Sequence, residues 1–177
     1  MTKDNLINHI FNHNTAETLP IPPKTILLEE GKIADRIYLI RKGCLRLFFY
    51  NEGKDITFQF FFEGDFVASF DSLYKGTPSL FSLESIEPSE VLFIKKEDFY
   101  NKIEGNSSLR KLYEEKIIER FSFYQHLFLS RIKNTPQQRY EELLKEYSNI
   151  IQRVPQHYIA SYLGITPVSL SRIRNRR

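Results

Sequence analysis

Residues 154–177 read VPQHYIASYLGITPVSLSRIRNRR, and this stretch decides how the C-terminal part of the chain folds. Apolar or small residues recur at helical spacing in both halves of it, at Ile159, Ala160, Leu163, Leu170 and Ile173. Each half is therefore predicted to form a helix with one buried face. Gly164 interrupts the pattern and suits the positive φ of a sharp turn. Pro155 begins the first helix, and Thr166 followed by Pro167 has the pattern of an N-cap and first-turn proline.

Positive charge collects at the same end of the chain, on Arg153, Arg172, Arg174, Arg176 and Arg177, and no carboxylate follows Glu146. A short helix with a polar first turn and a run of arginines suits a DNA major groove, where hydroxyls and guanidinium groups reach bases and phosphates. The alternative is a solvated basic C-terminus on an ordinary helical hairpin. The tight turn, the paired caps and the one-sided charge together favour DNA binding.

The segment IASYLGITPVSLSRIR, residues 159–174, resembles the helix-turn-helix of the Crp-Fnr family of bacterial transcription regulators. The resemblance implies that residues 166–174 form the recognition helix and that Arg172 contacts a base or a phosphate. Val168 stands where family members often carry glutamate, which accepts a hydrogen bond from cytosine, whereas valine makes only apolar contact. The operator sequence is therefore not carried over from the family. The expected DNA-contact residues are Thr166, Pro167, Val168, Ser169, Ser171, Arg172, Arg174 and Arg176.

The composition is that of an ordinary globular protein of one or two domains, with 177 residues, 41% hydrophobic and 27% charged. The net charge is only +3, so the positive charge is local rather than general. Cys44 is the single cysteine and forms no intramolecular disulfide, which favours a reducing compartment and a small buried apolar role. No signal peptide and no apolar run of membrane-spanning length is present, so we expect a cytoplasmic protein that does not bind membranes.

The middle of the chain changes character. Short runs rich in β-branched and aromatic residues alternate with glycine-containing turns, at residues 26–28, 37–40, 45–50, 56–62, 80–86 and 91–94. Many short strands at this spacing predict a sandwich or a barrel.

The same region resembles the Crp-Fnr sensor domain, a β jelly roll related to cyclic-nucleotide-binding domains. The motifs that carry the likeness are Tyr38-Leu39-Ile40-x-x-Gly43, Phe62-x-Gly64-Asp65-Phe66, Gly76-Thr77-Pro78 and Glu90-Val91-Leu92-x-Ile94. The implied architecture is α+β. It comprises a jelly-roll sensor domain (1–105), a connecting and dimerisation helix (106–133) and a winged-helix-like helix-turn-helix domain (134–177). Family members usually add a β-hairpin wing; whether this chain has one stays open, and residues 149–153 are the candidate for part of it.

The expected ligand pocket lacks the groups that hold a cyclic nucleotide. Nucleotide-binding family members use an arginine for the phosphate and a glutamate for the ribose, and those positions fall here on Ser79 and Ser69. Lys75 is the only cation between Ala68 and Leu83, and a buried phosphate without a cationic partner is disfavoured. An unknown apolar or anionic effector, regulation by a partner and the absence of a ligand all stay open. The degenerate pocket comprises Gly64, Ala68, Ser69, Pro78, Ser79 and Leu80.

No cofactor, metal or catalytic set is expected. Cys44 alone does not ligate an iron–sulfur cluster, no histidine is marked as a haem ligand, and His9 and His13 have no third metal ligand nearby. No nucleophile and base pattern occurs, so we expect that the protein is not an enzyme. The rival class is a ligand- or cyclic-nucleotide-binding module that acts through protein contacts.

A long helix follows the predicted sheet region. Apolar residues recur three and four apart from Leu109 to Ile132 without proline or glycine. One side of this helix is expected to pack on the sheet domain and the other on a second copy of the chain, because a helix-turn-helix works as a pair on a two-fold operator. The alternative is a long helix buried within one monomer. The expected dimer contacts are Tyr113, Ile117, Phe121, Tyr124 and Phe128.

Two further helices are expected, one directly after the long helix and one at the N-terminal end of the sequence. Thr135, Pro136 and Gln138 form a capping-box pattern for a helix after the long one, and residues 2–17 have the spacing of an amphipathic helix.

The favoured hypothesis is a homodimeric, sequence-specific DNA-binding regulator of the Crp-Fnr type. Its expected partners are double-stranded DNA, RNA polymerase and a small-molecule effector of unknown identity.

The serines at positions 69 and 79 generate a testable prediction. Cyclic AMP should show no saturable binding at micromolar concentration in equilibrium dialysis. The reason is that position 79 carries no guanidinium to neutralise the phosphate. Saturation of one site per chain at such concentrations would contradict this expectation.

Overall fold

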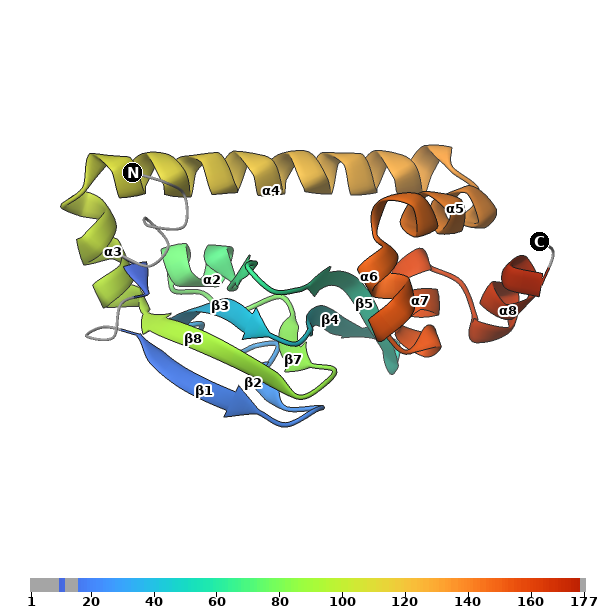
Figure 1. Cartoon of the computed structure of the whole chain (residues 1–177), viewed down its shortest axis with the longest axis horizontal. Coiled ribbons are helices and arrows are strands. Elements are labelled where there is room, and N and C mark those ends of the chain that lie inside the picture. The colour runs from blue at the N-terminus through green and yellow to red at the C-terminus, as the bar shows by residue number, and fades with distance from the viewer. Residues whose placement is uncertain (1–9, 12–15, 176–177) are drawn as a thin grey trace.

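The computed structural model describes residues 10–11 and 16–175. Its strands and helices are labelled as in Figure 1 and follow one another in the order β1 (Glu17–Ile21), β2 (Ile26–Leu28), β3 (Arg36–Lys42), β4 (Leu45–Asn51), β5 (Lys54–Phe61), β6 (Phe66–Val67), α2 (Phe70–Lys75), β7 (Ser82–Ser85), β8 (Ser89–Lys95), α3 (Lys96–Glu104), α4 (Ser107–Lys133), α5 (Pro136–Glu146), α6 (Ser148–Arg153), α7 (Gln156–Leu163) and α8 (Pro167–Asn175).

The strands form two antiparallel four-stranded sheets, with the orders β1-β8-β3-β6 and β2-β7-β4-β5. Strands that are distant in sequence pair in this alternating way in a jelly roll. Apolar side chains from both sheets meet in one core, which includes Ile40, Leu45, Leu47, Leu83 and Val91. The α+β fold with an N-terminal jelly roll, a long helix and a C-terminal helix-turn-helix is therefore confirmed.

Two strands were not expected from the sequence. In β1, the edge strand of its sheet, Pro20 pairs opposite Glu90 of β8. Proline is tolerated on an edge strand because its missing N–H faces away from the ladder. The other strand, β6, has only two residues and pairs Phe66 with Leu39.

Two local predictions concern residues 149–153 and residues 2–17. The expectation that residues 149–153 contribute to a β-hairpin wing is wrong, because they belong to α6, a helix whose Ile150 is buried. The predicted helix at residues 2–17, with His9 and His13, lies mostly outside the described residues. Of that segment, Ile10 and Phe11 are buried beside α3 and the first turns of α4, and Glu17 begins β1.

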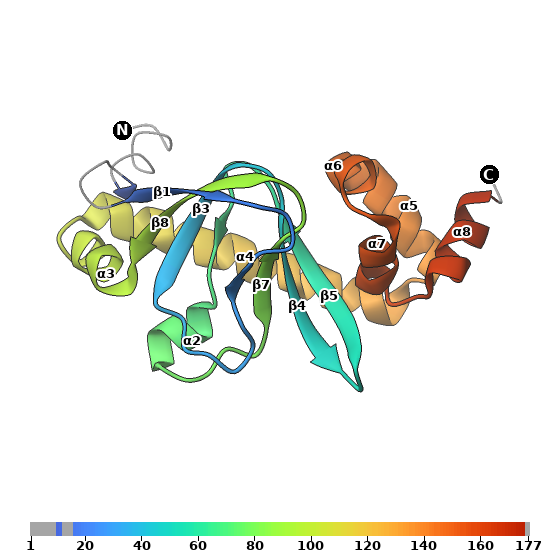
Figure 2. The ribbon, with the colours of Figure 1, turned by 90° about the horizontal axis from the view of Figure 1, so that it is seen from below.

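The long helix α4 has 27 residues and so spans about 40 Å. The side chain of Asn106 caps it, since Oδ1 accepts from the backbone N–H of Ser108 at 3.0 Å and of Leu109 at 3.1 Å. Figures 1 and 2 show α4 running past the sheets toward the C-terminal helices α5–α8, which lie beyond the β4–β5 end of the jelly roll.

The C-terminal helices share a core with the jelly roll. Cys44 from the turn between β3 and β4 and Phe60 of β5 pack in one buried cluster with residues of α5, α6, α7 and α8, among them Tyr140, Ile150 and Leu170. Burial raises the pKa of the Cys44 thiol, so it stays protonated and behaves as a small apolar group.

Candidate functional site

Helix α8 stands at one end of the molecule (Figure 1), and its polar residues Ser171, Arg172 and Arg174 are exposed to solvent. Leu170 is buried and Ile173 half-buried, so this side of α8 packs on the other C-terminal helices. Thr166 caps the helix, as predicted. Its Oγ1 accepts from the backbone N–H of Ser169 at 3.2 Å and lies 3.0 Å from the Ser169 hydroxyl.

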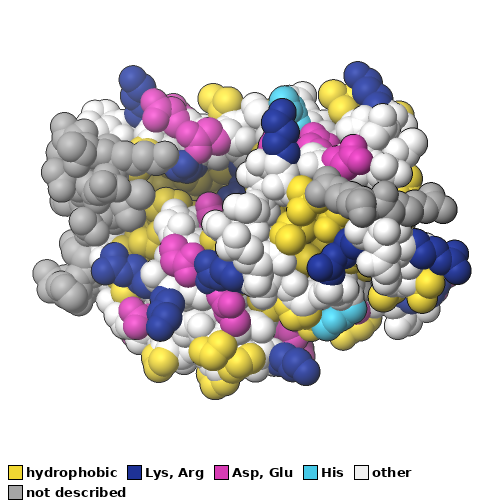
Figure 3. All heavy atoms as spheres, turned by 45° about the vertical axis from the view of Figure 1, so that its right-hand side comes forward, with side chains coloured by type: hydrophobic (Ala, Val, Ile, Leu, Met, Phe, Trp, Pro, Cys, Tyr) yellow, Lys and Arg dark blue, Asp and Glu magenta, His cyan; other side chains and the backbone are white. Residues whose placement is uncertain are grey.

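The predicted DNA-contact residues largely share this exposed surface. Thr166, Pro167, Ser171, Arg172 and Arg174 are exposed. Val168 is also exposed, at 59%, whereas Ser169 is half-buried beside Thr166. Arg176 lies outside the described residues. In Figure 3 lysine and arginine side chains are visible at the end of the molecule that carries α8.

The turn between α7 and α8 has the predicted geometry. Gly164 has φ 68° and ψ 35°, in the left-handed region that favours glycine. The N–H of Ile165 then donates to the carbonyl oxygen of Ala160 at 3.0 Å, which closes the end of α7. A Cβ atom at Gly164 would also lie only 2.9 Å from Nη1 of Arg131. The turn therefore requires glycine both for its φ and for space.

Two arginines hold the C-terminal end of α7. Arg131 from α4 donates to the carbonyl oxygen of Tyr162, and Arg139 from α5 donates to that of Leu163 at 2.9 Å. The last carbonyls of a helix carry partial negative charge and lack partners within the helix. These bonds therefore join α7, and with it the turn that sets α8, to α4 and α5.

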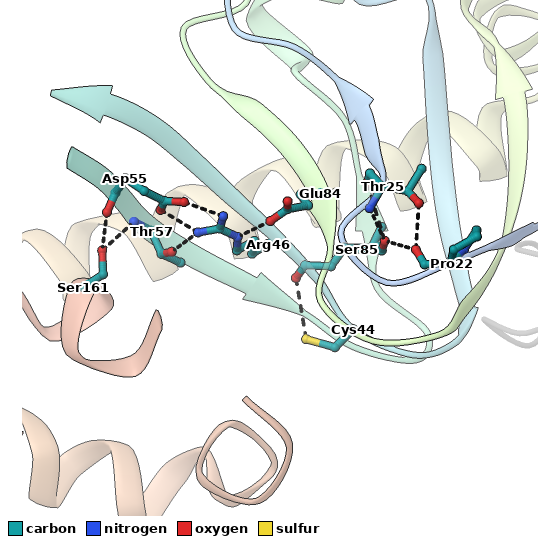
Figure 4. A network of polar contacts seen from close by, with 10 residues as sticks. Pro22, Thr25, Cys44, Arg46, Asp55, Thr57, Glu84, Ser85 and Ser161 are labelled. Carbon is teal, nitrogen blue, oxygen red and sulfur yellow. Dashed lines mark hydrogen bonds and ion pairs between the residues drawn. The ribbon is translucent and has the colours of Figure 1, made fainter. Parts of the chain in front are cut away.

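On its other side α7 rests on β5, the last strand in the order of its sheet. The Ser161 hydroxyl accepts from the backbone N–H of Thr57 at 2.9 Å and donates to the carbonyl oxygen of Asp55 at 3.0 Å. An edge strand presents unpaired backbone groups, and here one side chain of α7 satisfies two of them (Figure 4).

Next to this contact lies the buried guanidinium group of Arg46. Arg46 of β4 is only 2% exposed and pairs with Asp55 at 2.5 Å and with Glu84 at 2.7 Å. Its Nη1 also donates to the Thr57 hydroxyl at 2.8 Å. The plane of the group faces the Tyr158 ring of α7, 3.8 Å from the ring centroid. The sheet thus neutralises the cation with its own carboxylates and offers the face of the guanidinium to α7.

Arg153 does not belong to the basic surface with which the sequence groups it. It pairs with Glu63 at 2.8 Å and with Glu87, both from turns of the jelly roll. Glu63 also accepts from the backbone N–H of Gly43 at 2.8 Å. The hydrogen bonds from Arg153 lower the pKa of Glu63 to about 2. Arg153 is therefore a second anchor between the C-terminal helices and the jelly roll.

Sequence reasoning missed this interface for an identifiable reason. Arg46 lies inside the apolar run LRLFF, where one arginine reads as a solvent-facing strand position. Ser161 and Tyr158 read as exposed positions of a short helix. Only their pairing across more than a hundred residues, as from Ser161 to Thr57, reveals them.

The expected ligand pocket is closed by the chain's own side chains. Ser69 and Ser79 are both buried, with their hydroxyl oxygens 2.9 Å apart, and Ser79 Oγ lies 2.8 Å from the carbonyl oxygen of Phe81. Lys75 pairs with Asp71 at 2.6 Å on the surface. Of the other predicted pocket residues, Ala68 is buried, while Gly64, Pro78 and Leu80 are exposed.

A family model described as a cyclic nucleotide-binding domain matches residues 18–106, which is half of the chain. The chain belongs to the cyclic nucleotide-binding domain family. No curated protein matches it by sequence.

Solved structures extend the likeness over nearly the whole chain. FixK2 from Bradyrhizobium japonicum superposes with a TM-score of 0.80 at 18% identity, covering 91% of this chain and 83% of that one. CLP from Xanthomonas campestris, described as a c-di-GMP responsive global regulator, gives 0.79 at 15% identity with 98% and 91% covered. A CooA mutant from Carboxydothermus hydrogenoformans gives 0.76 at 16% identity with 99% and 85% covered. The resemblance to the Crp-Fnr regulators is thereby confirmed at the level of the fold.

In this cyclic nucleotide-binding domain protein, the five predicted dimer residues divide into two groups. Ile117, Phe121 and Phe128 are exposed, at 38%, 61% and 65%. Tyr113 and Tyr124 instead face the jelly roll: the Tyr113 ring lies 5.5 Å from that of Phe99, and the Tyr124 hydroxyl donates to Gln59 at 2.5 Å.

The described residues also bear on metal binding and membrane insertion. In residues 10–11 and 16–175 no group of three or more histidine, cysteine or acidic side chains could hold a metal ion. No helix in the same part of the chain is long and apolar enough to cross a membrane.

The Arg153–Glu63 pair generates a pH prediction. Because the pKa of Glu63 is lowered to about 2 from an ordinary 4.5, its contribution to stability is full above pH 4.5 and is lost as the pH falls toward 2. Replacing Arg153 by alanine should lower the free energy of unfolding by about 0.5–1 kcal/mol at pH 7, since the carboxylate is largely exposed. This deficit should shrink as the pH approaches 2.

Urea unfolding at pH 7 and at pH 2.5 measures the difference between the variant and the wild-type protein. Arg110→Ala is the matched control, because within the described part of the chain Arg110 pairs with Glu114 of the same helix, at 4.0 Å. An Arg153→Ala deficit of equal size at both pH values would show that the pair does not titrate as described.

Proposed function

We propose that this protein is a homodimeric, sequence-specific DNA-binding transcription regulator of the Crp-Fnr type that does not respond to cyclic AMP. The observation that carries the proposal is α8, an exposed helix with arginines in its last turn, set at a defined angle by the Gly164 turn. RNA polymerase is the proposed partner of the DNA-bound protein at a promoter.

The chemistry of α8 supports DNA as its ligand. Arg172 and Arg174 are exposed at its C-terminal end. The exposed Thr166, Pro167 and Val168 lie at its N-terminal end, which in a recognition helix faces the bases. Arginines further along such a helix neutralise phosphates, and Val168 offers apolar contact to a thymine methyl group.

The closed pocket supports independence from cyclic AMP. Ser69 and Ser79 bond to each other where the family places its ribose and phosphate ligands, and the nearby Lys75 is paired with Asp71. A cyclic nucleotide would have to break the serine pair and leave its phosphate without a cationic partner, which is costly in a buried site.

The outward face of α4 supports a dimer. Ile118, Phe121, Phe128 and Ile132 are 61–66% exposed, and with the exposed Gln125 they recur at alternating spacings of three and four. This spacing is that of a coiled-coil seam. A monomer would leave the apolar row in water, whereas a second copy of α4 would bury it and present two α8 helices to a two-fold operator.

Arg172 provides the test of the DNA contact. Replacing it by alanine should weaken binding to a duplex selected from a random library by about 1–3 kcal/mol, or roughly 5- to 150-fold. Fluorescence anisotropy at two salt concentrations measures this loss. Arg110→Ala removes an exposed arginine from the far end of α4 and should leave the affinity unchanged. Equal affinity of the Arg172 variant and the wild-type protein would refute the assignment.

Phe121 provides the test of the dimer. The Phe121→Asp variant should sediment as a monomer where the wild-type protein sediments as a dimer, because two carboxylates would be forced into an apolar seam. Ile33→Asp is the control, since Ile33 is 59% exposed but lies in the jelly roll. A monomeric wild-type protein, or a variant that remains dimeric, would exclude this seam.

A further inference from the structure

A cavity of about 290 Å³ opens where the jelly roll, α4 and the C-terminal helices meet. Strands and turns of the jelly roll contribute Phe60 and Phe66, α4 contributes Phe123, and the C-terminal helices contribute Ile150 and Tyr162. Figure 3 shows the surface hollowed beneath α4, with hydrophobic side chains in the recess. Of the residues predicted to form the ligand pocket, only Gly64 lines this cavity, whereas the buried pair Ser69 and Ser79 does not.

Aromatic side chains dominate the walls. Six phenylalanines line the cavity, at Phe60, Phe62, Phe66, Phe70, Phe99 and Phe123. Aromatic walls favour a flat apolar occupant, which can stack on the ring faces or meet the ring edges. An engineered apolar cavity of roughly 150 Å³ takes up benzene, so this cavity has space for a molecule of about two fused rings.

The charged groups beside the cavity already have partners within the chain. Asp65 accepts from the backbone N–H of Phe62 at 2.9 Å, and Lys116 pairs with Glu119. Arg120 donates to the carbonyl oxygen of Phe66 at 3.2 Å, and its guanidinium lies 4.6 Å from the centroid of the Phe61 ring. The two cations and two carboxylates also cancel in net charge. The lining as a whole therefore offers no excess charge of either sign to a charged ligand, whose lost hydration would be costly, so the site favours a neutral one.

Three tyrosines, Tyr113, Tyr147 and Tyr162, add neutral polar groups to the lining. Burial raises the pKa of the Tyr147 and Tyr162 hydroxyls, that of Tyr162 to about 12. Both therefore remain protonated in the ordinary pH range, and a phenol can donate a hydrogen bond. A ligand with one acceptor, such as a carbonyl oxygen, would complement them.

We propose that this cavity is the effector site of the regulator and binds a neutral, largely aromatic molecule of about two fused rings that carries one hydrogen-bond acceptor. The regulatory role of the site rests on the proposed function, whereas ligand binding in the cavity does not. An occupant would touch both sides of the interface at which the Phe60 ring of β5 and the Tyr162 ring of α7 lie 5.4 Å apart. Binding there would shift how α7 rests on β5, and therefore where α8 is held.

The binding test uses 7-methoxycoumarin, a neutral two-ring fluorophore with a lactone carbonyl. The chain contains no tryptophan, so the probe is excited at wavelengths where the protein does not absorb. The expected result is saturable binding of one probe per chain with a micromolar Kd. The carboxylate analogue 7-methoxycoumarin-4-acetate should bind at least tenfold more weakly. No saturable binding of the neutral probe, or tighter binding of the carboxylate, would overturn the proposed ligand class.

Two variants place the probe in the cavity. Phe123→Trp fills part of the space and should weaken binding at least tenfold, whereas Phe49→Trp makes the same exchange at a half-buried site of β4 outside the cavity and should have no effect. Tyr162→Phe keeps the packing but removes one donor and should weaken binding several-fold. Thermal unfolding of each variant verifies its fold. Unchanged binding by folded Phe123→Trp and Tyr162→Phe would place the probe elsewhere and refute the site.

DNA affinity, measured with and without the saturating probe, separates this inference from the proposed function. A change of at least threefold is expected if the cavity regulates DNA binding. DNA binding without probe binding would refute the cavity and leave the regulator intact. Probe binding by a protein that does not bind DNA would refute the regulator and leave the ligand site intact. Binding of both with no mutual effect would refute the effector role.

Discussion

A buried guanidinium that must keep its counter-ions is the constraint on which the arrangement of the molecule depends. Arg46 is almost fully buried and is neutralised by Asp55 and Glu84 from the strands on either side. Removing one partner of a buried pair costs about 3–5 kcal/mol, because the other charge is left without compensation. The three strands must therefore form together, and only the formed sheet presents the guanidinium face on which Tyr158 of α7 rests.

The contact between the C-terminal helices and the jelly roll is mainly polar at its periphery. Ser161 satisfies backbone groups of the edge strand β5, and Arg153 pairs with Glu63 and Glu87. Polar contacts between regions of one chain exchange readily with water, so such interfaces are compatible with relative motion. The proposed effector cavity lies beside this interface, where a small change in packing would alter the position of α8.

Local and repetitive features were predictable from the sequence. The α7–turn–α8 unit follows from helical spacing, one glycine and two capping positions, all within a few residues of one another. The antiparallel strands were recognised wherever β-branched runs ended at glycines. Prediction failed where context overrides local preference. Pro20 is accepted in β1 only because that strand lies at an edge, and residues 149–153 form a helix because Ile150 is needed in the C-terminal core.

By itself the sequence determined the two helices α7 and α8, the turn at Gly164 between them and the basic exposed side of α8, because each depends on neighbours within one or two helical turns. The tertiary structure alone decided that Arg153 pairs with the jelly roll instead of joining the basic surface, and that Tyr113 and Tyr124 face inward. It also decided that a cavity opens between α4, β5 and the C-terminal helices. The reason is physical: charges and aromatic rings interact with whatever the fold places within a few ångströms, and distance along the chain does not specify that neighbour.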